Sequence, residues 1–226
     1  MPQAGLKTRP TAVLFDLDGT LVDSAPDLAG TANDMRQQRG LPPLPYADLR
    51  PHAGSGARGM LGAALAVVPG QSLYIALRDE FHDRYEQRLL RQTALFEAVA
   101  ALLHTLHRAG VPWGIVTNKS LRFALPLTAA LQPLDLAGVV VGGDSTPFTK
   151  PHPGPLLEAA RRLGQDPGRC VYVGDDVRDM QAACAAGMPG WAAAWGYLGL
   201  HGPVHDWGAQ RVLAHPDEVL QILELA

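Results

Sequence analysis

Two aspartates lie one residue apart in the segment Asp16-Leu17-Asp18-Gly19-Thr20, directly after the apolar run Val13-Leu14-Phe15. A strand directs residues i and i+2 to the same face, so both carboxylates project into one space. At about 4 Å, two such charges repel by about 4 kcal/mol at an effective dielectric constant of about 20, and the pair needs a cation or a shared proton. One aspartate can then stay ionised as a nucleophile while the other holds a proton as a general acid.

A second acidic cluster, Gly174-Asp175-Asp176-Val177-Arg178-Asp179, follows the apolar run Cys170-Val171-Tyr172-Val173. Carboxylates that two strands deliver to one edge of a sheet need a hard divalent cation to hold them together. The hydroxyl of Thr20 can orient one of these carboxylates. A calcium-binding EF-hand loop is excluded, because it requires glycine at its sixth position and glutamate at its twelfth, where this chain has Leu21 and Asp27.

Two further segments offer groups that suit an anion. The segment Thr117-Asn118-Lys119 ends an apolar strand, and its hydroxyl, amide and backbone N–H groups can bind an anionic oxygen, although a helix N-cap explains it equally well. Lys150 lies in the proline-stiffened loop Thr149-Lys150-Pro151-His152-Pro153, where its ammonium can neutralise a phosphoryl oxygen. Taken alone, a lysine in such a loop is more often solvated.

Strands and helices alternate from Glu97 onward. The apolar pattern predicts strands at 11–15, 111–117, 138–141, 170–174 and 190–194, and helices at 98–109, 121–131, 155–163, 177–186 and 216–223. Repeated strand–helix units predict an α/β fold with a doubly wound parallel sheet covered on both faces. Sites in such sheets lie beyond the carboxyl ends of the strands, and Asp16, Thr117 and Asp175 all fall there.

The segment between the first strand and Glu97 has a helical pattern. A helix is predicted from the N-cap Ser24 to Arg39, a long helix from about 72 to 90, and no strand between 46 and 91. We therefore predict a helical cap at 23–91, inserted into a core made of 1–22 and 92–226.

One glycine-rich segment in this cap, Gly54-Ser55-Gly56-Ala57-Arg58-Gly59, matches the dinucleotide-binding fingerprint letter for letter. No apolar strand precedes it, so the match is accidental. We interpret the segment as a glycine loop that points from the cap toward the site. Arg58 is then a candidate for binding an anionic group of the substrate, with a solvated arginine as the alternative.

The composition excludes several classes of protein. The 226 residues include 19 Lys and Arg against 22 Asp and Glu, and the net charge of −3 gives no reason to expect nucleic acid as a partner. No apolar run approaches the ~20 residues that a membrane span requires, so no membrane partner is expected. Two cysteines make no disulfide framework. The expectation is a cytoplasmic protein.

The acidic pair, the Thr-Asn strand end, the loop lysine and the Gly-Asp-x-x-x-Asp cluster occur here in one order, and that order resembles the haloacid dehalogenase superfamily, in its magnesium-dependent phosphatase branch. The likeness covers nearly the whole chain. It implies a doubly wound core with an inserted α-helical cap. It also implies hydrolysis of a phosphomonoester through an aspartyl-phosphate, with Mg²⁺ as the cofactor.

The resemblance also implies roles for single residues. Asp16 would be the nucleophile and Asp18 the general acid and base. Thr117, Asn118 and Lys150 would bind the transferring phosphoryl group. Dehalogenases of the superfamily lack the second aspartate, so Asp18 favours a phosphatase.

The same resemblance implies a set of metal ligands. Asp16, the backbone carbonyl of Asp18 and the carboxylate of Asp175 would hold the Mg²⁺. Asp179 would orient Lys150 or a metal-bound water. Thr20 and Asp176 would lie with Asp179 in the layer of residues behind the metal ligands. Because Asp175 and Asp176 are adjacent, the sequence leaves open whether Asp176 also binds the metal.

Taken whole, the chain resembles phosphoglycolate phosphatases. Four stretches are even more similar to N-acetylmuramic acid 6-phosphate phosphatases: Arg39-Gly40-Leu41-Pro42-Pro43, Trp113-Gly114-Ile115-Val116-Thr117-Asn118-Lys119, Leu121-Arg122-Phe123-Ala124 and Gly174-Asp175-Asp176. The expected substrate is therefore a small molecule, either 2-phosphoglycolate or N-acetylmuramic acid 6-phosphate. The alternative is a phosphosugar mutase of the β-phosphoglucomutase type, and the sequence leaves open whether the protein is a monomer or a homodimer.

Overall fold

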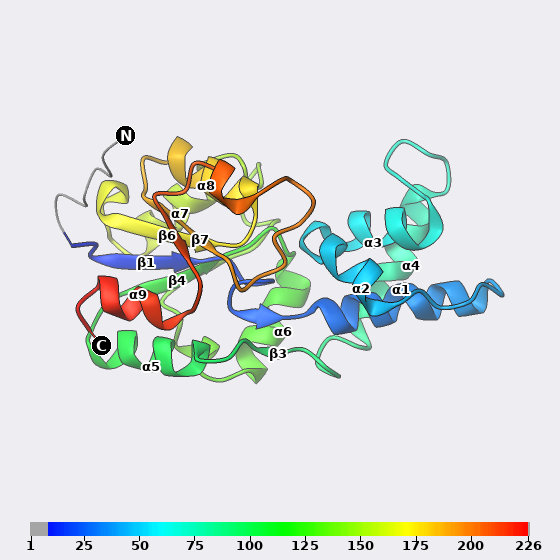
Figure 1. Ribbon diagram of the computed structural model, residues 1–226, viewed down its shortest axis with the longest axis horizontal. Helices are drawn as coiled ribbons and strands as arrows, with labels where there is room; N and C mark the ends of the chain where they lie inside the picture. The colour runs from blue at the N-terminus through cyan, green and yellow to red at the C-terminus, as the bar shows by residue number, and fades with distance from the viewer. Residues whose placement is uncertain (1–8, 226) are drawn as a thin grey trace.

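The core of the protein is a parallel six-stranded sheet. The computed structural model describes residues 9–225 (Figure 1). The strand order is β5-β4-β1-β6-β7-β8, and every neighbouring pair is parallel. The strands are β1 Ala12–Phe15, β4 Trp113–Val116, β5 Val140–Val141, β6 Cys170–Gly174, β7 Gly190–Ala193 and β8 Arg211–Leu213. This sheet confirms the predicted doubly wound α/β core.

The central strand β1 is buried on both faces, as expected for an apolar strand in a parallel sheet. Its side chains alternate: Val13 and Phe15 pack with the layer of α5, α6 and α9, and Ala12 and Leu14 pack with α7 and α8. These helices are α5 Val99–Arg108, α6 Leu121–Ala130, α7 Gly154–Arg162, α8 Val177–Ala185 and α9 Asp217–Ile222. Figure 1 shows α7 and α8 above the sheet and α5 and α9 below it.

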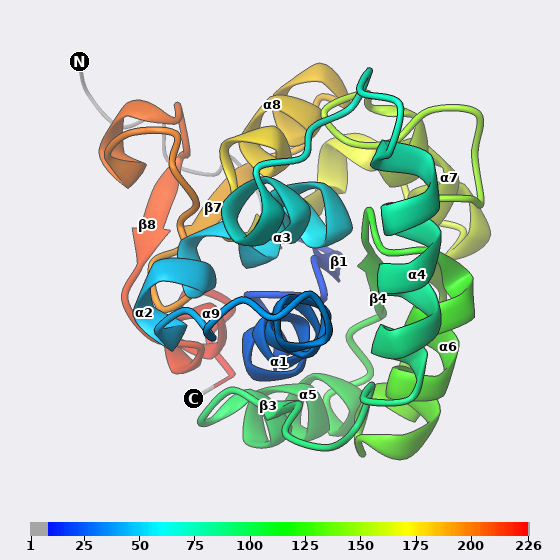
Figure 2. The same cartoon turned by 90° about the vertical axis from the view of Figure 1, so that its right-hand side faces the viewer.

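The chain between β1 and α5 forms a separate group of helices at one end of the core (Figure 1). They are α1 Ala25–Gln38, α2 Tyr46–Leu49, α3 Gly56–Leu65 and α4 Tyr74–Glu86, with a 3-10 turn at Arg50–Ser55. In the view of Figure 2, α1 is seen nearly end-on, and it contacts the other three helices. Buried apolar side chains hold this group together, among them Met35, Leu49, Met60, Leu61 and Phe81.

Two short strands join the core to the helices. β2, Val22–Asp23, pairs antiparallel with β3, Ala94–Leu95, so the outgoing and returning connections lie side by side. Neither of them, nor β8, is predicted from the sequence, because strands of two or three residues carry too little apolar pattern to detect. The division at 22/23 and 91/92 stays a prediction.

The structure corrects four local expectations. The long cap helix ends at Glu86, and the strand expected at 138–141 covers only Val140–Val141. Ser24 holds the N-cap position of α1, but its side chain accepts no hydrogen bond from the helix, and its hydroxyl donates to Asp18. The glycine segment is no open loop: its first half is a 3-10 turn and its second half begins α3, which places Arg58 in the first helical turn.

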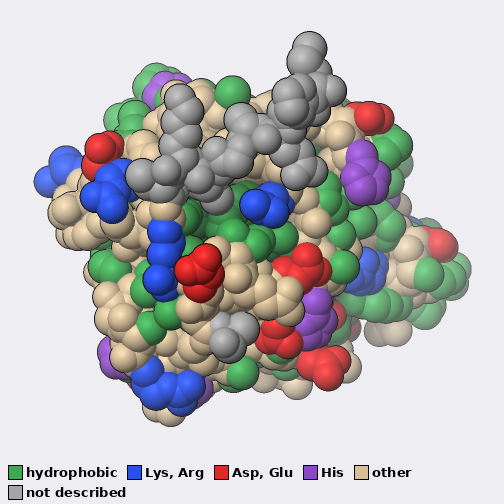
Figure 3. Space-filling model, turned by 60° about the vertical axis from the view of Figure 1, so that its left-hand side comes forward, with side chains coloured by type: hydrophobic (Ala, Val, Ile, Leu, Met, Phe, Trp, Pro, Cys, Tyr) green, Lys and Arg blue, Asp and Glu red, His purple; other side chains and the backbone are tan. Residues whose placement is uncertain are grey.

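The outer surface of the core carries mixed charge. On the face seen in Figure 3, Lys and Arg side chains are scattered among Asp, Glu, polar and apolar ones. This mixture follows from the nearly balanced composition. Within residues 9–225, no helix has both the length and the apolar character to cross a membrane.

Candidate active site

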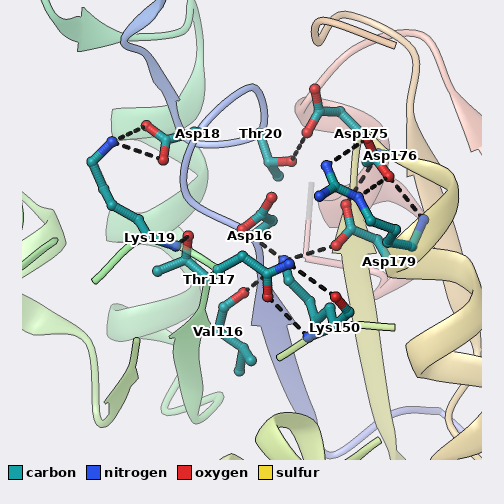
Figure 4. Close-up of polar contacts among 12 residues, drawn as sticks. Asp16, Asp18, Thr20, Val116, Thr117, Lys119, Lys150, Asp175, Asp176 and Asp179 are labelled. Atoms are coloured by element: carbon teal, nitrogen blue, oxygen red, sulfur yellow. Dashed lines mark hydrogen bonds and ion pairs between the residues drawn. The ribbon is translucent and has the colours of Figure 1, made fainter. Parts of the chain in front are cut away.

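Residues from four separate segments meet at the carboxyl edge of the sheet (Figure 4). Asp16 follows β1, Thr117 follows β4, Asp175 follows β6, and Lys150 lies in the loop before α7. Parallel strands all end at the same edge, so residues far apart in sequence are brought together. All four are candidate site residues in the sequence.

The ammonium of Lys150 lies at the centre of this group and is almost completely buried. Its Nζ is 2.8 Å from Asp16 Oδ1 and 2.7 Å from Asp179 Oδ1. It also lies 2.7 Å from the Tyr172 hydroxyl and 3.1 Å from the carbonyl oxygen of Val116. Burial acts to lower the pKa of Lys150, but Asp16 and Asp179 more than offset that effect and raise it. Lys150 is therefore a fixed positive charge beside Asp16.

Asn118 holds the backbone on which Lys150 sits. Its Nδ2 donates to the Lys150 carbonyl at 3.0 Å, and the Lys150 N–H donates to its Oδ1 at 2.9 Å. Thr117 is buried beside it and accepts a hydrogen bond from the Lys119 N–H. Because both ends of its amide are engaged, Asn118 positions the lysine loop, and its predicted contact with phosphate stays a prediction.

Three carboxylates converge next to Lys150. One oxygen each of Asp16, Asp175 and Asp179 lies within 4.8 Å of the other two, and all three residues are buried. Burial raises the pKa of Asp16 to about 6, with Lys150 opposing and Asp179 and Asp18 adding to the rise. Burial, Asp16 and Asp179 raise the pKa of Asp175 well above its ordinary value. Three buried carboxylates against one ammonium leave an excess of negative charge, so the residues fit a divalent cation.

Asp175 is held rigidly. Its Oδ2 accepts the Tyr197 N–H at 2.7 Å and its Oδ1 accepts the Thr20 hydroxyl at 3.3 Å. Gly19, with φ +85°, and Gly196 lie so close that a Cβ on either would overlap Asp175. Thr20 thus orients a carboxylate, as the sequence predicted, and the two glycines explain how the backbone approaches it.

Asp176 and Asp179 open helix α8 with a capping box, in which each side chain accepts a backbone N–H of the first turn. Asp176 also pairs with Arg178, whose Nε lies 2.7 Å from Asp176 Oδ1. Although burial acts to raise it, the Arg178 guanidinium lowers the pKa of Asp176. Asp179 uses Oδ2 for the Asp176 N–H and Oδ1 for Lys150. These contacts favour a supporting position for both residues.

Asp18 has a different set of partners. Lys119 Nζ lies 3.0 Å from each of its carboxylate oxygens, and Ser24 Oγ donates to Oδ1. Figure 4 shows Asp18 turned toward Lys119. The sequence predicts only a helix N-cap for Ser24 and no separate role for Lys119. The position of Lys119 directly after Thr117 and Asn118 was the available signal.

A cavity of about 490 Å³ lies over this site, between the core and the cap helices. Asp16, Asp18 and Lys150 line it from the core, and Tyr85 and Arg58 from the cap. Its other arginines, Arg78, Arg122 and Arg178, are each paired with a carboxylate. Within residues 9–225, Arg58 takes part in no ion pair, and it is exposed to the solvent of the cavity.

Comparison with known proteins agrees with this geometry. Residues 10–187 match the family model described as haloacid dehalogenase-like hydrolase, and the chain belongs to that family. It is 47% identical over 211 residues to a phosphoglycolate phosphatase of Xanthomonas campestris pv. campestris (strain 8004), which covers 93% of this chain and 95% of the relative. An N-acetylmuramic acid 6-phosphate phosphatase of Pseudomonas aeruginosa is 37% identical over 220 residues, or 97% of each chain.

The fold gives the same result. The crystal structure of a predicted phosphoglycolate phosphatase from Haemophilus somnus 129PT superposes with a TM-score of 0.84 at 27% identity, over 96% of this chain and 99% of that one. The predicted superfamily is therefore confirmed. Within it, the chain is a phosphatase, that is, a phosphoric monoester hydrolase.

Proposed function

We propose that this phosphatase hydrolyses a small phosphomonoester with Mg²⁺ through an aspartyl-phosphate on Asp16. One observation carries the proposal: a buried carboxylate, Asp16, faces a cavity while a buried ammonium, Lys150, lies 2.8 Å away. The ammonium keeps Asp16 available as an anion and can balance the charge on phosphoryl oxygens.

The reaction then has two halves. A carboxylate oxygen of Asp16 bonds to phosphorus while the bond from phosphorus to the ester oxygen breaks. The leaving oxygen keeps the electron pair of that bond and receives a proton from Asp18. In the second half, water gives a proton to Asp18 and its oxygen bonds to phosphorus. The bond from phosphorus to Asp16 breaks, which releases inorganic phosphate and restores the carboxylate.

Asp16, the backbone carbonyl of Asp18 and Asp175 would hold the metal. When bound, Mg²⁺ supplies positive charge that offsets both the carboxylates and the phosphoryl oxygens. Asp179 has both oxygens engaged by N–H donors, and we assign it to orienting Lys150. Asp176 pairs with Arg178 in the same supporting layer.

The names of the relatives suggest two substrates, 2-phosphoglycolate and N-acetylmuramic acid 6-phosphate. Both molecules carry a carboxylate besides the phosphate, and Arg58 offers the cavity an arginine without a carboxylate partner among residues 9–225. We therefore propose that the substrate is a carboxylate-bearing phosphomonoester. A cytoplasmic location stays an expectation from the sequence.

The direct test measures inorganic phosphate released from the two substrates by the purified protein. We expect kcat/KM of about 10⁴ M⁻¹s⁻¹ or more for at least one of them. Activity should vanish in excess EDTA and return with added Mg²⁺. Turnover that is indifferent to chelation would contradict the metal assignment. Isomerisation of a hexose 1-phosphate without release of phosphate would instead support the mutase.

Replacing Arg58 tests the carboxylate proposal. Arg58→Ala should raise KM for the better carboxylate-bearing substrate about 10-fold, since one exposed charge-assisted contact is worth about 1.4 kcal/mol. KM for phenyl phosphate, which has no carboxylate, should change less than about 2-fold. Arg161→Ala, on the exposed side of α7, is the matched control. An equal rise in KM for both substrates would remove Arg58 from carboxylate recognition.

A further inference from the structure

The ammonium of Lys119 contacts both carboxylate oxygens of Asp18. Its Nζ is 3.0 Å from Oδ1 and 3.0 Å from Oδ2, so the ammonium sits symmetrically across the group. Ser24, at the start of the cap helix α1, donates its hydroxyl to the same Oδ1. Three donor contacts from two different elements thus fix one side chain, which is itself only 15% exposed.

Lys119 is in turn fixed by the cap. Its side chain is 7% exposed, and Nζ lies 4.8 Å from the ring centroid of Tyr85 on helix α4. Tyr85 is 2% exposed and packs edge-on against Phe123 of α6, with ring centroids 5.3 Å apart. A buried ammonium between a carboxylate and an aromatic face has little freedom to move.

We propose that Lys119 is a positioning residue, which acts through Asp18 by holding that carboxylate at the leaving-group side of the cavity. The inference rests on the proposed function, because it assumes that Asp18 transfers the proton to the leaving oxygen. It assigns Lys119 no contact with the phosphoryl group, which Lys150 serves from the other side of Asp16.

The charges around Asp18 give the physical reason. Asp16 and Asp18 are two residues apart, and they repel each other across the same edge of the sheet. Without Lys119, only the Ser24 hydroxyl among the described residues would hold the Asp18 carboxylate, and the side chain would be free to adopt other rotamers. Proton transfer depends on heavy atoms within about 2.6–3.2 Å of each other, so an Asp18 carboxyl group in another rotamer would be a poor proton donor to the leaving oxygen. Lys119 removes that freedom.

Leaving-group chemistry separates this role from a structural one. Phenyl phosphate and 4-nitrophenyl phosphate have nearly the same shape, but nitrophenoxide leaves readily without a proton, whereas phenoxide depends on one. Lys119→Met should lower kcat/KM for phenyl phosphate about 100-fold, the lower end of what general acid catalysis contributes, and for 4-nitrophenyl phosphate by less than about 5-fold. The control, Arg162→Met, removes an exposed, paired cation of α7. Equal losses for both esters, or no loss for either, would overturn the proposal.

A double-mutant cycle keeps the test decisive if Lys119→Met folds poorly. In the Asp18→Asn background no carboxylate is left unpaired, and Lys119→Met should change kcat/KM by less than about 2-fold, because the residue it acts through is gone. A further large loss in that background would show that Lys119 binds the substrate itself, which contradicts the proposal.

The outcomes also separate this inference from the proposed function. If Asp16→Asn retains turnover, the aspartyl-phosphate mechanism fails, whatever Lys119 does. If Asp16 is essential but the two aryl esters respond equally to Lys119→Met, the mechanism stands and only the positioning role is lost.

Discussion

Asp16→Asn should lower kcat by at least about 1000-fold while the fold is retained. The amide is a poor nucleophile but has nearly the shape of the carboxylate, and its oxygen can still accept from Lys150. Steady-state release of phosphate measures the loss, and circular dichroism with thermal melting measures the fold. Acid quenching with labelled substrate should trap phosphoprotein from the wild type and none from the variant.

The control for this variant is Asp217→Asn, which changes a half-exposed aspartate at the start of α9 and should leave kcat within about 2-fold of the wild type. Turnover of Asp16→Asn near the wild-type value would exclude covalent catalysis at this residue. If the variant loses both its activity and its melting transition, the trapping experiment on the wild type tests the mechanism instead. Absence of phosphoprotein in that experiment would contradict the mechanism.

Asp175→Asn should lower the activity measured with Mg²⁺ and raise the free energy of unfolding measured without metal. Activity with Mg²⁺ should fall at least about 100-fold, because a carboxylate of the proposed metal site is lost. In EDTA at pH 8 the free energy of unfolding should rise, because one buried charge that Asp16 and Asp179 repel has been removed. The amide can still accept the Tyr197 N–H. A gain of about 1 kcal/mol would raise Tm by about 2–4 °C.

The pH dependence follows from the sign of the pKa shift. The folded-state pKa of Asp175 is raised above its unfolded value, so its contribution to stability is fully present below the unfolded pKa and is lost as pH rises through the folded one. The advantage of Asp175→Asn in EDTA should therefore disappear near pH 4. The contrasting variant is Asp176→Asn, which should lose stability at pH 8, because Arg178 lowers the pKa of Asp176. A lower Tm for Asp175→Asn in EDTA at pH 8 would contradict the charge argument.

The long, strongly patterned elements of the core could be predicted from the sequence alone. The apolar run of β1 predicts a strand that is buried on both faces, and the spacing of apolar residues in α5 predicts a helix with one buried face. The structure shows both. β2, β3 and β8 were missed because two or three residues carry too little apolar pattern to indicate a strand. Ser24 lies at the N-cap position that its local pattern predicts, but its hydroxyl donates to Asp18, a contact that this pattern does not indicate.

The sequence by itself determined which residues carry charge and which of them follow an apolar strand, because residue type and the apolar pattern of a strand are local properties. It placed Asp16 and Asp175 directly after strands in this way, whereas the role expected of the loop residue Lys150 came from the family resemblance. Only the tertiary structure decided how these charges compensate one another. That Asn118 clamps the lysine loop and that Lys119 spans Asp18 depends on distances across the sheet edge, and no spacing along the chain encodes them.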